Sequence, residues 1–242
     1  MKILIGTPII DKKMYSWVQY VRAINKLVIP NIGEAFGNDR IQIHKLIVDT
    51  SDKEDTLLLD VKAAGFAYYY VKTGKAMDKV VLARNTIFDF AIDGKFDYIL
   101  LIDSDVIIPE DTLMQLLSAQ ADIVSGFYPL MNENGLPIPN AKMLSGFTRG
   151  SMMGYIDFPS DKLPGGKVYP VDLVGLGCCL ISKKIFENYR FRCERGKYGD
   201  LIKSEDWCFC EDLKKDGIAI MFDTGLNCKH KIIGEHWKEG EA

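Results

Sequence analysis

Residues 98–105 read Tyr98-Ile-Leu-Leu-Ile-Asp-Ser-Asp105, and residues 109–117 read Pro109-Glu-Asp-Thr-Leu-Met-Gln-Leu-Leu117. The first stretch is a short aliphatic run behind a charged segment, which predicts a strand buried on both faces of a parallel sheet. The second stretch begins with a proline, which suits the first turn of a helix, and its leucines recur at helical spacing. We therefore expect Asp103 and Asp105 at the carboxyl end of a central strand, where open α/β sheets bind their ligands.

Two carboxylates at such a position have two interpretations. Paired oxygen ligands could hold Mg²⁺ or Mn²⁺ against a diphosphate. Alternatively, Asp103 and Asp105 are solvated acids in a strand-to-helix turn, because an Asp-x-Asp sequence is common by itself. The strand context and the further polar residues described below favour the metal site.

The composition is typical of a single α/β domain. The chain has 242 residues and a formal net charge of −3 without a block of like charges, so nucleic acid is not an expected partner. The apolar run within residues 2–8 is too short for a signal peptide and predicts a first strand. No stretch approaches the ~18 apolar residues of a membrane span, so we expect no transmembrane segment, while peripheral membrane contact stays open.

Six cysteines all lie in the second half of the chain and lack paired C-x-x-C spacing. A chain of this length does not need covalent crosslinks, so a disulfide framework or a zinc site is the less favoured interpretation. Reduced, mostly buried thiols in a cytoplasmic protein are expected instead.

Strand-like and helix-like segments alternate through the first half of the chain. The expected strands are residues 2–5, 43–48, 66–71, 98–102 and 121–127, and the expected helices include residues 18–24, 56–64 and 76–92. This order predicts an α/β fold with a mostly parallel, doubly wound, Rossmann-like sheet flanked by helices. Farther along, residues 171–182 and 218–222 predict strands and residues 183–189 and 205–216 predict helices, with Gly65 and Gly217 as helix ends.

Residues 129–170 interrupt this pattern. They are rich in Pro, Gly, Asn and Met and contain few periodic segments. A segment this long is unusual as an idle loop within a compact domain, so we interpret it as a lid-like or acceptor-side insertion.

Arg84 and Asn85 fall on the apolar stripe of the helix expected at residues 76–92. A guanidinium group that faces a sheet needs a partner, because an unpaired buried charge is costly. The partner could be an aspartate of the next strand, which would be a structural role. It could equally be a ligand phosphate or ribose, to which arginine offers two parallel hydrogen bonds.

An acidic pair begins the helix expected at residues 205–216. Ser204 resembles an N-cap, so Glu205 and Asp206 occupy the first turn, where the helix dipole favours acids. That structural explanation is sufficient, but the same position would keep a carboxylate ionised and ready to act as a base. Adjacent helical residues point about 100° apart. We expect Asp206 to face the sheet and cleft, and Glu205 to lean toward the face of Phe209 and Asp212.

These features resemble the glycosyltransferase-A fold, found in the nucleotide-sugar-dependent glycosyltransferases of the family-two type. The resemblance extends from Lys2 to about His230. It is carried by residues 99–105, by the small-residue stretch 175–182 before a helix, and by Glu205-Asp206 ahead of residues 213–217.

The resemblance implies roles for the acidic residues. Asp103-Ser104-Asp105 matches the family's D-x-D motif, which implies that Asp103 and Asp105 hold Mn²⁺ or Mg²⁺ and that Asp103 and Ser104 contact the donor. His230 matches a histidine that completes the metal shell in many relatives, with His236 as a rival. Asp206, with Glu205, matches the acidic pair that contains the catalytic base of inverting members.

The resemblance also divides the chain into two functional halves within one domain, residues 1–242. Residues 1–128 would bind the nucleotide, and residues 129–242, with the insertion at 129–170, would bind the acceptor. The segments that would line the nucleotide pocket contain Thr7, Pro8, Asp49, Arg84 and Asn85. Residues 48–52 depart from the family, because they are shorter than its usual acidic motif and leave base contacts through Asp49 and Ser51 less defined.

The expected function is that of a metal-dependent hexosyltransferase. It would move a sugar from a UDP- or GDP-sugar to a hydroxyl group of a glycan, lipid or protein acceptor, with inversion at the sugar carbon. One alternative is a nucleotidyltransferase acting on a sugar phosphate, although residues 5–10 lack the basic, glycine-rich loop that such enzymes use. Another alternative is a non-catalytic module that binds nucleotide sugars.

Overall fold

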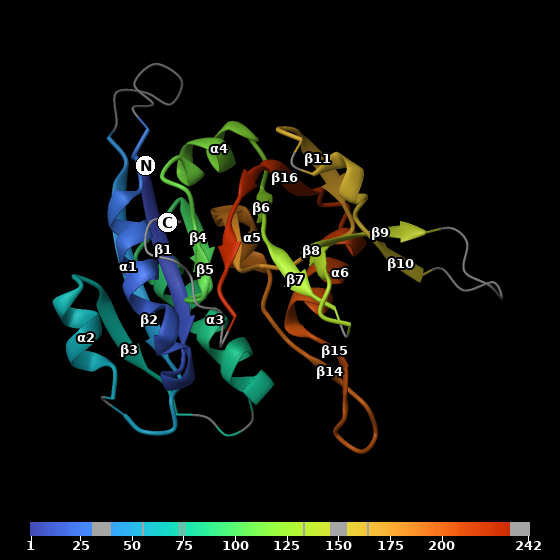
Figure 1. Ribbon diagram of the computed structural model, residues 1–242. Coiled ribbons are helices and arrows are strands. Elements are labelled where there is room, and N and C mark those ends of the chain that lie inside the picture. The colour runs from blue at the N-terminus through green and yellow to red at the C-terminus, as the bar shows by residue number, and fades with distance from the viewer. Residues whose placement is uncertain are drawn as a thin grey trace.

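The computed structural model describes residues 1–30, 40–54, 56–72, 74, 76–132, 134–145, 154–163 and 165–232. One large sheet runs through the molecule with helices on both sides (Figure 1). In spatial order its eight strands are β11 (Val168–Val171), β16 (Ile220–Asn227), β6 (Ile123–Phe127), β13 (Cys178–Ser182), β4 (Tyr98–Ile102), β1 (Lys2–Ile9), β2 (Gln42–Asp49) and β3 (Ala67–Tyr70).

The sheet is mixed and mostly parallel. Strands β3, β2, β1 and β4 pair in parallel, as do β16 and β6. Strand β13 runs antiparallel to both of its neighbours, and β11 is an antiparallel edge strand. A parallel neighbour requires a crossover connection, usually a helix, whereas β13 follows a segment of short strands and can enter the sheet in the opposite direction. The predicted α/β class with a mostly parallel sheet is confirmed.

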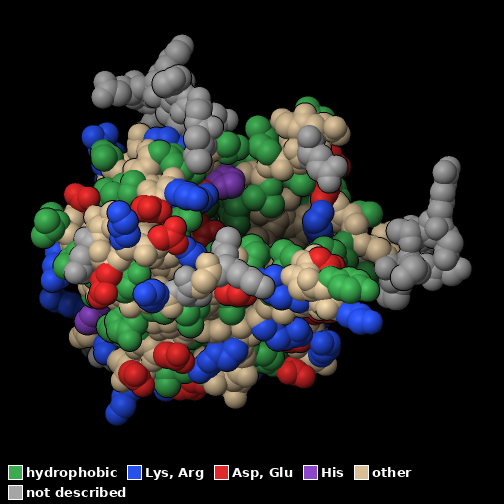
Figure 2. Space-filling model, turned by 90° about the horizontal axis from the view of Figure 1, so that it is seen from below, with side chains coloured by type: hydrophobic (Ala, Val, Ile, Leu, Met, Phe, Trp, Pro, Cys, Tyr) green, Lys and Arg blue, Asp and Glu red, His purple; other side chains and the backbone are tan. Residues whose placement is uncertain are grey.

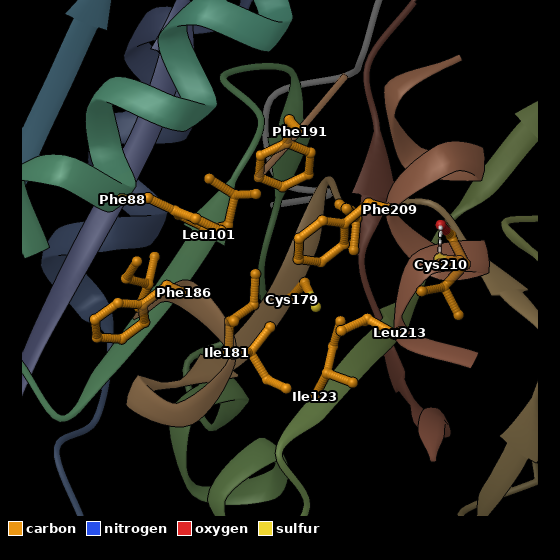
Figure 3. Close-up of a cluster of buried hydrophobic side chains, with 14 of the residues drawn as sticks. Phe88, Leu101, Ile123, Cys179, Ile181, Phe186, Phe191, Phe209, Cys210 and Leu213 are labelled. Carbon is orange, nitrogen blue, oxygen red and sulfur yellow. Dashed lines mark hydrogen bonds between the residues drawn. The ribbon is translucent and has the colours of Figure 1, made fainter. Parts of the chain in front are cut away.

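Helices cover both faces of this sheet. The helices on one face are α1 (Trp17–Lys26), α2 (Leu58–Ala63) and α4 (Thr112–Ser118), and those on the other are α3 (Ala76–Asp93), α5 (Lys183–Asn188) and α6 (Glu205–Lys215). Successive strand residues alternate between the two cores, so Ile3 and Ile5 pack in the first and Leu4 in the second. Figure 3 shows the second core, where Phe88, Phe186 and Phe209 meet the sheet.

Most element boundaries follow the local signals in the sequence. The helices predicted to end at Gly65 and Gly217 do end there, and both glycines have positive φ angles, 80° and 72°. The prediction that Pro109 lies in the first turn of a helix is wrong, because α4 begins at Thr112. A turn precedes it, in which the Thr112 hydroxyl donates a 2.7 Å hydrogen bond to the Pro109 carbonyl.

The segment 129–170 contains more regular structure than its composition predicts. Its described part contains the strands β7 (Pro129–Met131), β8 (Pro137–Pro139), β9 (Ala141–Ser145) and β10 (Gly154–Asp157) and the 3-10 turn η2 (Ser160–Lys162). Strands β7 and β8 form a hairpin, and β10, β9 and β12 (Leu173–Val174) form a small sheet. Short edge strands tolerate proline, so the proline-rich composition of this segment did not predict them. Residues 133, 146–153 and 164 of the predicted insertion lie outside the described residues.

Three short elements complete the carboxyl edge of the large sheet. The 3-10 helix η1 (Asp11–Ser16) follows β1 directly. Strands β5 (Val106–Ile107) and β17 (Lys229–His230) pair antiparallel, with His230 opposite Val106. A remaining hairpin consists of β14 (Glu194–Arg195) and β15 (Leu201–Lys203). The pairing of β5 with β17 brings the predicted histidine beside Asp105.

The cysteines agree with the expectation of reduced, mostly buried thiols. All six cysteines are free thiols, and every one except Cys193 is buried. Within the described ranges, no helix combines the length and the apolar character needed to cross a bilayer.

Gly6 in β1 offers a test of the packing between the sheet and α3. A Cβ atom added at Gly6 would overlap the Ile87 side chain of α3. We expect Gly6→Ala to lower the free energy of unfolding by ~1–3 kcal/mol, as overpacking of a core does, when measured by urea denaturation. Gly74→Ala is the control, because, its two chain neighbours aside, no atom of the described residues lies within 4 Å of its added Cβ. Equal stability of the two variants would contradict this packing.

Candidate active site

A cavity of about 310 Å³ opens at the carboxyl edge of the large sheet. Segments after β1, β2, β4 and β6 line it together with parts of α3, α6 and β17. Figure 2 views this side of the molecule and shows a hollow with charged and histidine side chains around it. The predicted site residues that line the cavity are Pro8, Arg84, Asp103, Ser104, Asp105, Glu205, Asp206 and His230.

Arg84 connects three carboxyl groups on one side of this cavity. Its side chain is only 2% exposed. One terminal nitrogen, Nη1, donates to Glu205 Oε1 at 3.1 Å and to Asp206 Oδ1. The other, Nη2, donates to Asp103 Oδ1 at 3.2 Å. Of the two partners considered from the sequence, an aspartate of the next strand is therefore the one that the structure shows.

The three carboxyl groups outnumber the single guanidinium charge. Burial raises the pKa of Glu205 to about 7, and the nearby charge of Asp206 acts in the same direction, whereas Arg84 opposes the shift. Burial likewise raises the pKa of Asp103 against the effect of Arg84. Among the described residues, Arg84 Nε and Glu205 Oε2 have no hydrogen-bond partner. Near neutral pH, a proton on Glu205 would bring this buried cluster closer to charge balance.

Asp206 faces the cavity, as expected, and Cys210 and Leu213 on its side of α6 are buried, but Glu205 lies deeper still. The side chain of Glu205 is 8% exposed and that of Asp206 is 26% exposed. The face of α6 that Glu205 shares with Phe209 is buried, because Phe209 stacks on Phe191 with ring centroids 4.3 Å apart. The charge pattern of the helix did not indicate that this face is buried as well. Asp206 is consequently the carboxylate more accessible to a ligand, and its Oδ2 accepts a 3.3 Å hydrogen bond from the Leu176 N–H.

Asp105 forms a second charged cluster. Its side chain is 6% exposed, and its Oδ2 accepts a hydrogen bond from Lys13 Nζ and a 3.3 Å bond from the Tyr15 hydroxyl. His230 Nε2 lies 3.4 Å from the same oxygen. Burial alone would raise the pKa of Asp105, but hydrogen bonds from His230 and Lys13 lower it to about 2. Asp105 therefore remains an anion at neutral pH.

The orientation of His230 is fixed by its other ring nitrogen. Nδ1 lies 3.0 Å from the Pro129 carbonyl oxygen, which can only accept, so Nδ1 carries a hydrogen. Nε2 faces Asp105 and donates to it when the ring is protonated. Burial would lower the pKa of His230, but this interaction with Asp105 raises it. A histidine that ligates a metal is oriented in the same way, by donating from one nitrogen to a carbonyl group and binding through the other.

The carboxylate of Asp105 and the imidazole of His230 are suitable ligands for a divalent cation. Mg²⁺ is usually bound by one or two carboxylates together with phosphate oxygens, and carboxylate ligands also suit Mn²⁺. Asp105 and His230 already converge, whereas Asp103 is directed toward Arg84. In the part of the chain that the structure describes, no group of three His, Cys, Asp or Glu side chains is placed to hold a metal by itself. Substrate oxygens would have to complete such a site.

Three residues predicted for the nucleotide pocket lie outside the cavity. Thr7 is buried and hydrogen-bonds to the Tyr20 hydroxyl. Asp49 accepts bonds from Ser51 and Tyr68, and its neighbour Thr50 lines the cavity instead. Asn85 binds the backbone of Phe191 through both its amide nitrogen, at 3.0 Å, and its oxygen, at 2.8 Å. These three side chains support the structure around the cavity.

Lys13 and Tyr128 are two of the cavity residues that were not identified from the sequence. Lys13 lies in η1, immediately beyond the carboxyl end of β1, and that position was the available signal. Tyr128 is buried, accepts a 2.9 Å hydrogen bond from the Gly177 N–H and packs edge-on against His230. A Cβ at Gly177 would lie 3.0 Å from Asp103 Oδ2 and 2.8 Å from the Tyr128 hydroxyl oxygen. Glycine at this position therefore permits Tyr128 and Asp103 to approach the backbone.

Glu205 should make the stability of the protein decrease as the pH rises. Its pKa is about 7 in the folded protein against an ordinary value of 4.5, so the folded state binds the extra proton between these values. The stabilisation is complete below pH 4.5 and is lost as the pH rises through about 7. Glu205→Gln keeps a neutral group, so we expect its melting temperature relative to the unaltered protein to increase between about pH 5 and about pH 8.

Differential scanning fluorimetry across this pH range measures the effect. Each kcal/mol of difference moves the melting temperature of a domain of this size by about 2–4 °C. Glu187→Gln, at an exposed glutamate of α5, is the matched control and should show no such trend. Parallel pH profiles for Glu205→Gln and the unaltered protein would contradict the raised pKa.

The comparisons with known proteins identify the fold. No family model and no curated protein sequence matches the chain. Among solved structures, GalNAc-T7 with UDP, GalNAc and Mn²⁺ has a TM-score of 0.60 at 11% identity, and the match covers 95% of this chain and 43% of that one. Residues 1–349 of S. aureus TarS with UDP-GlcNAc have a TM-score of 0.56 at 15% identity, covering 98% and 60%.

A third similar structure is A197 from STIV, with a TM-score of 0.51 at 14% identity and coverage of 96% of this chain and 86% of that one. The chain thus spans less than two thirds of the GalNAc-T7 and TarS structures that it resembles. At these identities the likeness concerns the fold. The protein has the α/β fold of the glycosyltransferase-A enzymes over nearly its whole length.

Proposed function

We propose that the protein is a metal-dependent glycosyltransferase that moves a hexose unit from a UDP- or GDP-sugar to an acceptor hydroxyl group with inversion. The observation that carries this proposal is the Arg84 cluster, which holds Asp103 and Asp206 at one cavity. Transfer of a sugar needs one side chain near the diphosphate of the donor and a base at the acceptor. Asp103 would supply the first and Asp206 the second, and the two carboxylates come from separate elements. Solved structures of the same fold contain UDP-GlcNAc or UDP with Mn²⁺, which supports the choice of donor.

The donor would occupy the cavity with its diphosphate near Asp105. Asp105 and His230 would hold the divalent cation, and Asp103 would lie beside it. When bound, such a cation stabilises the negative charge that develops on the leaving diphosphate. Lys13 and Lys79 also line the cavity and would add positive charge near the phosphate oxygens.

The acceptor would approach from a neighbouring cavity of about 150 Å³. Asp206 lines both cavities, and Trp207 and Ser204 line the second. An aromatic ring beside polar groups suits a sugar or another partly polar acceptor. The boundary between the two cavities is where an acceptor hydroxyl would meet the donor's sugar.

Asp206 would act as the general base. Its Oδ1 is held by Arg84, while Oδ2 accepts only the 3.3 Å bond from Leu176 among the described partners and would take the hydroxyl proton. The acceptor oxygen would attack the sugar carbon from the side opposite the diphosphate, which inverts that carbon. Glu205 lies too deep for this role and would position Arg84 and Asp206 instead.

Metal dependence of donor binding tests the donor site. We expect UDP or GDP to bind the unaltered protein more tightly with Mn²⁺ than without it, and Asp105→Ala to remove this difference, when measured by isothermal titration calorimetry. Asp161→Ala, at an exposed residue of η2, is the control. Before the calorimetry, a thermal-shift screen can identify the nucleotide, because a ligand at a hundredfold excess over its Kd stabilises the fold by about 2.7 kcal/mol. Equal affinity with and without metal would refute the proposed cation.

The base is tested by separating transfer from binding. Asp206→Asn should reduce the transfer rate by ~10²–10⁴ and leave donor affinity nearly unchanged, because a base acts in the transition state. Glu205→Gln should reduce the transfer rate by a smaller factor. Donor turnover, donor affinity and the anomeric configuration of the product, determined by NMR, are the measurements. Full activity of Asp206→Asn would exclude it as the base, and a product of retained configuration would exclude inversion.

A further inference from the structure

We propose that the ammonium group of Lys13 occupies the place of the divalent cation at Asp105 and leaves it when the cation binds. The inference rests on the metal site of the proposed function. It adds a residue of this chain that sets the affinity of that site for metal.

The first observation is that Lys13 and the metal would use the same oxygen. Lys13 Nζ hydrogen-bonds to Asp105 Oδ2, the atom that lies 3.4 Å from His230 Nε2. The Asp105 side chain is 6% exposed, whereas that of Lys13 is 40% exposed. Lys13 therefore reaches Asp105 from the open side of the cavity, from which an ion would also arrive.

The second observation is that the backbone around this contact is tied down. The Lys231 N–H donates to the Asp105 carbonyl at 2.8 Å. The Tyr15 hydroxyl donates to the Lys231 carbonyl at 3.1 Å, and Lys231 Nζ donates to the Tyr15 carbonyl at the same distance. Because η1, β5 and the end of β17 are linked in this way, the movable part of the contact is the flexible lysine side chain.

A metal ion and the ammonium group cannot both occupy this position. A divalent cation such as Mg²⁺ lies ~2.1 Å from its oxygen ligands, and two cations on one carboxylate oxygen repel each other. A nearly buried carboxylate without a cation is costly, so Lys13 neutralises Asp105 before the metal arrives. Once displaced, the ammonium group stays at the same cavity, where a diphosphate brings new negative charge.

Mn²⁺ binding without nucleotide tests the exchange, because its readout is metal affinity and not activity. We expect Lys13→Met to bind Mn²⁺ roughly five- to tenfold more tightly than the unaltered protein in isothermal titration calorimetry, since the competing hydrogen-bonded charge is gone. Lys13→Gln should behave in the same way, and provides a second variant if the first folds poorly. Lys13→Arg retains the charge and should bind close to the unaltered value.

The matched control is Lys12→Met, which removes the same charge from the exposed neighbouring position of η1 and should leave Mn²⁺ affinity unchanged. The inference is overturned if Lys13→Met and Lys13→Gln bind Mn²⁺ no more tightly than the unaltered protein. It is also overturned if Lys13→Arg increases Mn²⁺ affinity as much as Lys13→Met does, because the shape of the side chain and not its charge would then be responsible.

Donor turnover by the unaltered protein distinguishes this result from a failure of the proposed function. If turnover requires Mn²⁺ while the Lys13 variants bind the metal as the unaltered protein does, only the role of Lys13 is refuted. If the unaltered protein neither turns over a donor nor binds Mn²⁺, the proposed function and the role of Lys13 both fail.

Discussion

The buried guanidinium group of Arg84 is the interaction on which the rest of the site depends. An arginine on the apolar face of α3 is tolerated only when its charge is paired, because an unpaired buried charge is costly. Asp103 at the end of β4 and the acidic pair at the start of α6 supply that pairing. Phe191 adds a cation–π contact 5.5 Å from the guanidinium carbon. The same group thus fixes the start of α6 against the central strand.

Two aspartates separated by one residue have opposite environments. Asp103 belongs to a cluster with a fixed, buried cation, and burial raises its pKa. Asp105 belongs to a cluster in which its partners, Lys13 and His230, are more exposed than it is, and its pKa falls to about 2. The cluster around Asp103 is suited to fixing the positions of its side chains. The cluster around Asp105 is suited to exchanging one cation for another. Two residues of the same short turn after β4 therefore have different roles, one structural and one in ligand binding.

Local patterns in the sequence predicted the elements more accurately than the contacts between them. The aliphatic run before Asp103 and the glycine after α6 act on their own neighbours, so strand β4 and the helix end were predicted correctly. Lys13 and Tyr128 were missed because their roles depend on residues distant in the chain. The depth of Glu205 was not predicted, because the packing of Phe209 on Phe191 buries a face of α6 whose charges did not indicate burial.

The pairing of β17 with β5 has a consequence for folding and local opening. His230 reaches Asp105 only after a strand from the end of the described chain docks against the turn that follows β4. A strand of only two residues near the end of the described chain has few neighbours, and such segments are among the first to open in native-state fluctuations. An ion held by both residues would act across this junction as a crosslink between distant segments. Occupancy of the site and protection of β17 from hydrogen exchange would therefore rise together.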